Sequence, residues 1–165
     1  YIMNRDALSW DELFILQATL IAQKSKDPST KVGCVIVNDD NVILSTGFNG
    51  FPRGIEEDAD VRWRRPEKYN WVEHAERNAI YNAARVGVSL NGSRAYLNWE
   101  PKPCAECTRA LIQAGVKEVI GPNRVFQGKG AGKHYSIDHA EVMLREAGVR
   151  VRVFDLPPEL GIPPE

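Results

Sequence analysis

Helical and strand-like hydrophobic patterns alternate along the second half of the chain, and this alternation limits the folds it can adopt. Apolar residues recur at helical spacing over 73–85, 104–114 and 138–147, and strand-like runs occupy 94–99, 116–120 and 149–154. Gly115 and Gly148 follow the last two helical stretches, where glycine is favoured. Because strands joined through helices run parallel in one sheet, this half predicts an α/β domain with a partly parallel sheet.

The first half adds one helix and a pair of strands. Ser9 and Glu12 have capping-box spacing at the start of a helix that we predict over 9–25, and Asp27-Pro28 ends it. Residues 32–37 and 42–46 flank a turn and predict a β-hairpin, which brings the strand count to five. Residues 47–69 show no period, and a loop of that length is usually functional or mobile.

We expect a single domain over residues 1–165, with its core at about 9–154 and an irregular tail at 156–165 that holds four prolines. The formal net charge of -1 gives no long-range attraction to nucleic acid or to a membrane. No apolar run approaches the ~20 residues of a membrane span, and no signal peptide is visible. Three cysteines, two of them close together, do not form a secreted disulfide framework, so we expect a cytoplasmic protein. Basic residues cluster at 62–68 and 129–133, which fits solvated loops or, alternatively, a grip on phosphate.

His74, Cys104 and Cys107 form the strongest functional motif. Each has an ordinary explanation: a lone histidine is commonly a core or surface residue, and a Cys-x-x-Cys pair can be a redox pair, half of a structural zinc site or two buried thiols. Together they offer one imidazole and two thiolates from the first turn of a helix, whose N–H groups and dipole favour the thiolate form. This set predicts a bound Zn²⁺ ion.

The choice of fourth ligand separates a catalytic zinc from a structural one. Cys34 lies in an apolar strand, and His134 and His139 have no ligand-like spacing. Three protein ligands leave one position for water, whose pKa falls to roughly 7 on such a metal. Glu76, two residues after His74, can take a proton from that water and return it to a leaving amine, although it also fits a helix N-terminal carboxylate.

His-x-Glu followed by Pro-Cys-x-x-Cys is the signature of zinc-dependent base deaminases, and the chain has it at 74–76 and 103–107. In that reaction water attacks the ring carbon that bears the exocyclic amine, and ammonia leaves. Deaminases of free nucleosides or of bases in tRNA share the signature, but polynucleotide binders usually show a broad basic surface. A zinc-stabilised binding module without enzymatic activity would need a fourth ligand and leaves Glu76 without a role.

From about residue 10 to residue 154 the chain resembles the deoxycytidylate (dCMP) deaminase family. Beyond the zinc motifs, the resemblance rests on Ser-Lys-Asp-Pro-Ser-Thr-Lys-Val-Gly at 25–33, Gly-Phe-Asn-Gly-Phe-Pro-Arg-Gly at 47–54, and Lys-Tyr at 68–69 before His-Ala-Glu-Arg-Asn-Ala-Ile at 74–80. It implies a three-layer α/β/α cytidine-deaminase-like fold with a five-stranded mixed sheet. It also implies zinc-dependent hydrolysis of dCMP, a small-molecule nucleotide, to dUMP and ammonia, with Glu76 as the catalytic residue.

The resemblance also implies which residues contact the nucleotide. Asn49 is expected to hydrogen-bond the sugar or the base, and Ser25, Lys26 and Asn78 are candidates for the 5′-phosphate end. Lys26 fits a helix C-terminal cation equally well, and Asn49 fits a turn residue with positive φ. Aromatic side chains that either stack on the base or pack in the core and loops are Phe51, Trp63, Trp71, Trp99 and Tyr135.

Members of that family are often homo-oligomers, such as dimers or hexamers, that dCTP activates and dTTP inhibits. The segment 47–54 is similar to the part that binds those effectors, so Gly50, Arg53 and Gly54 are candidate effector contacts. Residues 99–103 depart from the family by a longer approach to the cysteines. Because that stretch should border the pocket, 5-methyl-dCMP and 5-hydroxymethyl-dCMP are alternative substrates.

Overall fold

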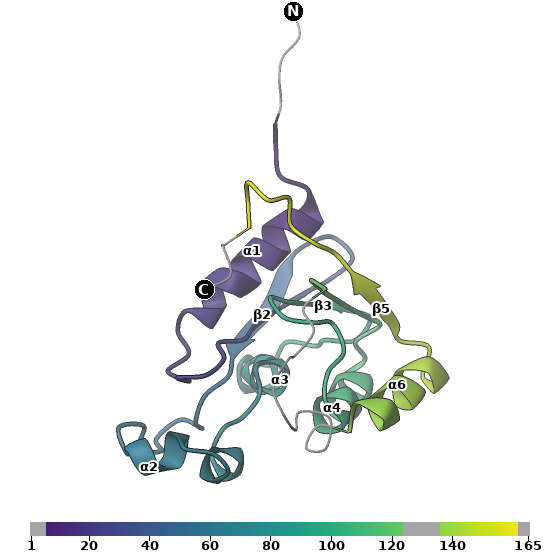
Figure 1. The fold of residues 1–165 in the computed structure, drawn as a ribbon. Coiled ribbons are helices and arrows are strands. Elements are labelled where there is room, and N and C mark those ends of the chain that lie inside the picture. The colour runs from purple at the N-terminus through teal and green to yellow at the C-terminus, as the bar shows by residue number, and fades with distance from the viewer. Residues whose placement is uncertain (1–5, 124–135, 162–165) are drawn as a thin grey trace, which may run out of the picture.

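The computed structural model describes residues 6–123 and 136–161, and in it helices cover both faces of one sheet (Figure 1). The elements follow the chain as α1 (Trp10–Ala22), β1 (Gly33–Val37), β2 (Ile43–Phe48), α2 (Asp60–Trp63), the 3-10 helix η1 (Glu67–Asn70), α3 (Ala75–Val86), β3 (Arg94–Leu97), α4 (Ala105–Ala114), β4 (Glu118–Gly121), α6 (Ile137–Glu146) and β5 (Arg150–Val153). The predicted order of long helices and strands is confirmed. Residues 47–69, where no period was visible, hold the end of β2, the short helix α2 and most of η1.

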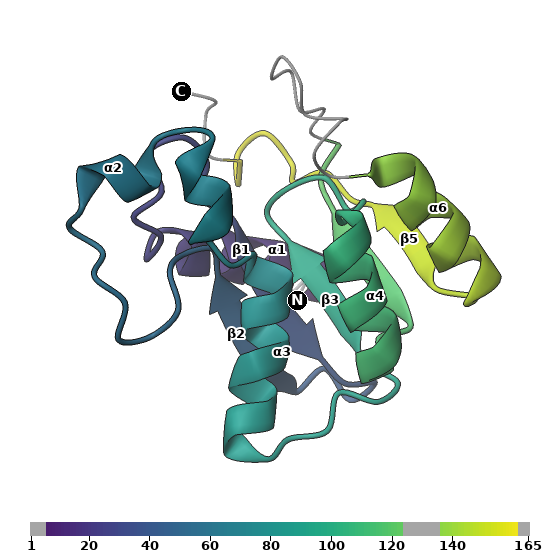
Figure 2. The same ribbon diagram turned by 90° about the horizontal axis from the view of Figure 1, so that it is seen from below.

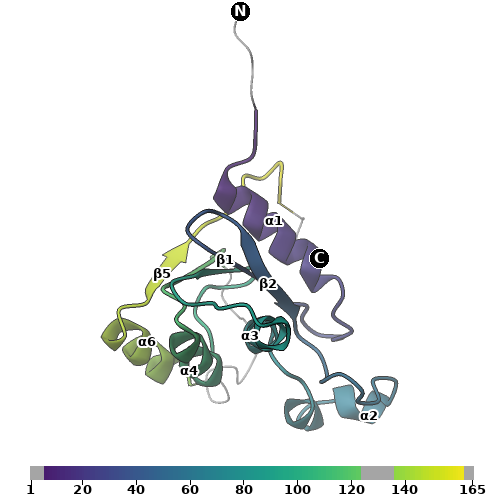
Figure 3. The ribbon, with the colours of Figure 1, turned by 180° about the vertical axis from the view of Figure 1, so that it is seen from behind.

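The sheet has five strands in the order β2-β1-β3-β4-β5. Strand β1 runs antiparallel to β2 and β3, whereas β3, β4 and β5 run parallel to one another. Helix α1 lies on one face, and α3, α4 and α6 lie on the other, as the views from below and from behind show (Figures 2 and 3). The expected three-layer α/β/α fold with a five-stranded mixed sheet is therefore confirmed.

Strand β1 is buried on both faces, which explains its continuous apolar run. Val35 and Val37 belong to the core cluster that includes Phe14 of α1. Cys34 and Ile36 belong to the opposite cluster, which includes residues of α3 and α4. The interpretation of Cys34 as a core residue is thus confirmed.

Two glycines, Gly33 in β1 and Gly47 in β2, allow helices to approach the sheet closely. A Cβ atom on Gly33 would lie 2.0 Å from the carbonyl oxygen of Ala18 in α1, and one on Gly47 would lie 2.5 Å from that of Ala75 in α3. Any side chain at these positions would push the helix away, because real Cβ atoms do not approach backbone so closely. The first turn of α3 is therefore pressed onto β2, and this turn carries the predicted active-site residues.

The ends of the elements differ slightly from the predictions. The capping box of Ser9 and Glu12 is present, but α1 ends at Ala22 rather than near residue 25, because the next N–H groups bond to carbonyls three residues back. Residues 156–161 form no helix or strand, as expected for the proline-rich tail. None of the helices in 6–123 and 136–161 combines the length and apolarity needed to cross a bilayer.

Candidate metal centre and pocket

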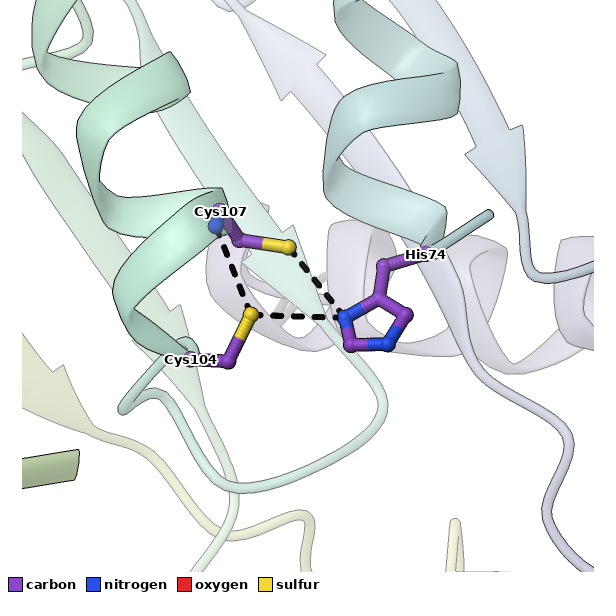
Figure 4. Close-up of side chains that lie close together, drawn as sticks. All are labelled: His74, Cys104 and Cys107. Carbon is purple, nitrogen blue, oxygen red and sulfur yellow. Dashed lines mark hydrogen bonds between the residues drawn. The ribbon is translucent and has the colours of Figure 1, made fainter. Parts of the chain in front are cut away.

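The starts of two helices bring the predicted metal ligands together (Figure 4). His74 is the N-cap residue of α3, Cys104 is the N-cap residue of α4, and Cys107 lies in the first turn of α4. The Nδ1 atom of His74 lies 3.4 Å from the sulfur of Cys104 and 3.3 Å from that of Cys107. All three ligand atoms lie within 4.8 Å of one another.

These distances fit a tetrahedral metal site. Bond lengths typical of zinc place a nitrogen and a sulfur ligand about 3.5 Å apart, close to the distances found here. One imidazole and two thiolates are also a donor set that suits zinc. Among the described residues, the group of mutually close ligand atoms has three members, and neither Cys34 nor His139 belongs to it. His134 lies outside the described residues.

Hydrogen bonds among the two thiols and the imidazole shift their pKa values in different directions. The hydrogen bond with Cys107 is the main cause that lowers the pKa of Cys104, to about 4, and the same bond together with burial raises the pKa of Cys107. Burial is the largest single influence on the pKa of His74 and lowers it, but the bond with Cys104 and the negative charges of Glu76 and Cys104 together raise the pKa above its usual value. These directions describe the protein groups alone, and a divalent cation displaces such protons when it binds.

Glu76 lies beside the ligands at the bottom of the pocket. Its side chain is 8% exposed, and its Oε2 lies 3.7 Å from the sulfur of Cys107. Burial is the main cause that raises the pKa of this carboxyl. A raised pKa suits a group that must both accept and release a proton near neutral pH.

Arg77 connects the two helix starts. Its guanidinium pairs with Glu73, which precedes α3, and donates a 2.5 Å hydrogen bond to Glu106 in the first turn of α4. Glu73 in turn accepts the backbone N–H of His74 at 3.0 Å. Glu106 lies in the first turn of α4, where the helix dipole also favours a negative charge.

His74, Cys104 and Glu76 line a pocket of about 620 Å³, and Cys107 lies buried beside them. Its wall includes residues of the turn after α1, of η1, of α4 and of the segment 99–103, which confirms that this segment borders the pocket. Lys68 is paired with Asp27, and Lys102 is paired with Glu141. Arg65 and Arg109 also line the pocket and have no salt bridge within the described part of the chain.

Of the predicted nucleotide contacts, the structure places Asn49 on the pocket wall. Ser25, Lys26 and Asn78, the candidates for the 5′-phosphate end, do not line this pocket. The buried hydroxyl of Ser25 donates to the backbone oxygen of Asn49, and Asn78 donates to that of Phe48. Lys26 pairs with Glu57 at 2.7 Å.

The candidate effector residues Gly50, Arg53 and Gly54 do not line the pocket. Gly50 forms a backbone bridge with Glu73, the residue before the first metal ligand. Arg53 donates to the side chain of Asn82 in α3, and Gly54 has a φ of 84°. This segment is therefore joined through its backbone to the entrance of α3.

The aromatic candidates separate into two groups. Phe51 stacks on Trp63 with ring centroids 4.2 Å apart and makes a tilted contact with Trp71, so these three pack with one another. Trp99 lines the pocket. Tyr135 lies outside the described residues.

Sequence reasoning missed the cationic side of the pocket. Arg65 and Lys68 lie in the basic cluster 62–68, for which solvated loops were the simpler expectation. Arg109 follows Cys107 by two residues, so it is held by the same helix start as the ligands. These cations could have been found from their positions close to the zinc motifs in the sequence, because a count of charges takes no account of position.

The chain is similar in sequence to known proteins. A family model described as the zinc-binding region of cytidine and deoxycytidylate deaminases matches residues 8–122. The chain belongs to this deaminase family. It is similar to the deoxycytidylate deaminase of Mus musculus, with 39% identity over 155 residues, which cover 90% of this chain and 82% of the mouse protein. The human deoxycytidylate deaminase is also 39% identical, over 158 residues and with the same coverage.

A solved structure of the same family extends the likeness to the fold. The dCMP deaminase of cyanophage S-TIM5, crystallised with dCMP and dUMP, superimposes with a TM-score of 0.69 and 27% sequence identity. The match covers 93% of this chain and 100% of the phage protein. The likeness therefore includes the whole sheet with its covering helices, and it is not confined to the zinc motifs.

Proposed function

We propose that this deaminase hydrolyses dCMP to dUMP and ammonia with one zinc ion. The observation that carries the proposal is that His74, Cys104, Cys107 and the buried Glu76 form one group at the wall of the pocket. The deoxycytidylate deaminases of mouse and human, and the phage enzyme crystallised with dCMP and dUMP, support this substrate. In the balanced reaction, dCMP and water give dUMP and ammonia.

In this proposal the protein holds the metal and moves one proton. His74, Cys104 and Cys107 bind zinc, which when bound lowers the pKa of a water molecule to about 7. Glu76 accepts a proton from water and delivers it to the amine that leaves the pyrimidine ring. Burial of Glu76 excludes bulk water as a competing proton donor and keeps its carboxyl at the reaction site.

We further propose that Asn49 contacts the sugar or the base and that Arg65 and Arg109 bind the 5′-phosphate. The two guanidinium groups lie at the pocket without salt-bridge partners among the described residues, and guanidinium groups bind phosphate through paired hydrogen bonds. Ser25, Lys26 and Asn78 can act on the nucleotide indirectly, through the loop that carries Asn49 and through β2. The longer segment 99–103 at the pocket makes 5-modified dCMP a further candidate substrate.

Regulation, assembly and location belong to the same proposal. We propose that dCTP and dTTP act through Gly50, Arg53 and Gly54, because the bridge between Gly50 and Glu73 connects this segment to the start of α3. We also propose a cytoplasmic homo-oligomer, in keeping with the family.

An ammonia-release assay on the zinc-loaded chain tests the substrate assignment. It compares dCMP, 5-methyl-dCMP, dCTP, deoxycytidine and adenosine-containing RNA, each with and without dCTP or dTTP. We expect the highest kcat/KM for dCMP or its 5-methyl derivative. Turnover of deoxycytidine or RNA alone would contradict the proposal.

A further inference from the structure

A buried ion pair lies in the wall of the pocket. The Nζ atom of Lys68 in η1 lies 2.9 Å and 3.1 Å from the two carboxylate oxygens of Asp27, which follows α1. The two side chains are 6% and 3% exposed, and both line the pocket. Buried charges persist only when they are paired, so each holds the other in place.

The carboxylate of Asp27 also accepts hydrogen bonds from neighbouring residues and so fixes their positions. Its Oδ1 accepts the backbone N–H groups of Ser29 at 2.8 Å and Thr30 at 3.2 Å, which fixes the turn after α1. Its Oδ2 accepts a 3.4 Å hydrogen bond from the side-chain amide of Asn49. Lys68 and Asn49, the residue proposed to contact the nucleotide, therefore bind the same carboxylate group.

The existing hydrogen bonds of the Asn49 side chain leave it able to form one more hydrogen bond. Its Nδ2 donates to the oxygen of Thr30 at 2.9 Å and to Asp27, which uses both of its hydrogens. Its Oδ1 accepts the backbone N–H of Val32 at 2.8 Å, so a second lone pair on this oxygen is the remaining capacity. These neighbours also fix which end of the amide is oxygen, because a backbone N–H must meet an acceptor. Asn49 can therefore only accept a further hydrogen bond.

This polarity limits what Asn49 can bind in dCMP. The nucleotide has two kinds of strong donor, the 4-amino group and the 3′-hydroxyl, and the amino group is lost in the proposed reaction. An acceptor on the wall of the pocket therefore suits the 3′-hydroxyl of the sugar.

We infer that Lys68 is a positioning residue, which through Asp27 holds Asn49 as an acceptor for the 3′-hydroxyl of the nucleotide. The inference rests on the proposed function for its substrate, whereas the positioning itself can be observed without turnover. It makes Lys68, which is 19 residues from Asn49 in the sequence, part of the recognition of the sugar.

The kinetic test uses the zinc-loaded full chain with Lys68→Met, and with Lys68→Met/Asp27→Asn, which leaves no unpaired charge. Substrates are dCMP and its 3′-deoxy analogue. We expect both variants to raise KM for dCMP about 10-fold while kcat changes less than about 3-fold, because binding common to ground and transition state is lost. For the 3′-deoxy analogue, the KM should be the same in the variants as in the wild type. Lys24→Met, at an exposed lysine outside the pocket, is the matched control.

A second readout separates failure of this inference from failure of the proposed function. Nitrogen-15 NMR follows hydrogen exchange at the side-chain amide of Asn49 in the same variants, with no substrate present. We expect exchange at least about 10-fold faster in Lys68→Met and in the double variant. Unchanged exchange in a folded variant, or an equal rise of KM for dCMP and its 3′-deoxy analogue, would overturn the inference. If the wild-type chain does not turn over dCMP but the variants show the expected faster exchange at Asn49, the substrate assignment is wrong and the positioning role of Lys68 stands.

Discussion

Among single residues, Glu76 shows most clearly how burial prepares a carboxyl group for proton transfer. Its pKa is raised mainly by burial, and it lies in contact with a ligand sulfur without belonging to the ligand group. We predict that Glu76→Gln lowers kcat for dCMP by at least about 10²-fold, because an amide cannot carry the proton. Zinc content and melting temperature should stay at wild-type values. Loss of zinc in this variant would indicate a structural role, and Glu146→Gln, exposed on α6, is the control.

Arg109 carries a second prediction about a single residue. Because it lines the pocket without a salt bridge in the described residues, Arg109→Gln should raise KM for dCMP about 10-fold, the size expected for one lost charge-assisted contact. The KM for deoxycytidine, which has no phosphate, should not change. Steady-state kinetics with both substrates provides the measurement. An equal effect on both would place Arg109 elsewhere, and Arg85→Gln in the exposed last turn of α3 should have no effect.

Among the elements, α3 and α4 matter most, because their first turns carry the ligands and Arg77 joins them. We predict that Arg77→Met weakens zinc binding about 10-fold, as is common when groups behind metal ligands are removed. Competition with a chelator measures the affinity, and Arg85→Met on the same helix is the control. Wild-type affinity in Arg77→Met would show that the sheet alone positions the two helices.

The elements also show where sequence reasoning works. Cys-x-x-Cys and His-x-Glu spacings are local, and the sequence placed both motifs near helix starts, where the structure has them. The contact of His74 with Cys104 spans 30 residues, and the combined motif rather than a local period indicated it. Helices α2 and η1 were not predicted, because four residues are too few for a hydrophobic period. Their placement decides that Lys68 enters the pocket, and no local pattern indicates its pairing with Asp27, 41 residues away.

For the whole molecule, a charged cluster joins the two ends of the described chain. Asp11 in α1 accepts hydrogen bonds from Arg152 in β5 and from Tyr96 in β3. The hydrogen bond from Arg152 is the main cause that lowers the pKa of Asp11 below its usual value. A folded-state pKa below the unfolded value stabilises the fold above about pH 4, and this contribution is lost as pH falls through the folded-state pKa.

We therefore predict that Asp11→Asn lowers the free energy of unfolding at pH 7 by about 1 kcal/mol, the upper range for a partly exposed pair. The difference from wild type should shrink steadily below pH 4. Urea unfolding at several pH values measures it. Asp39→Asn, which breaks the exposed pair with Lys117, should cost less, and an equal cost in both variants would contradict the role of the cluster.

The proposed zinc site has three protein ligands and leaves one coordination position open. Zinc K-edge X-ray absorption on the zinc-loaded full chain tests this most directly, because it counts sulfur atoms and imidazoles around the metal and also senses His134. The account predicts two sulfurs at about 2.3 Å, one imidazole and one further light atom that is not part of an imidazole. A third sulfur or a second imidazole would close the coordination shell and contradict a catalytic zinc.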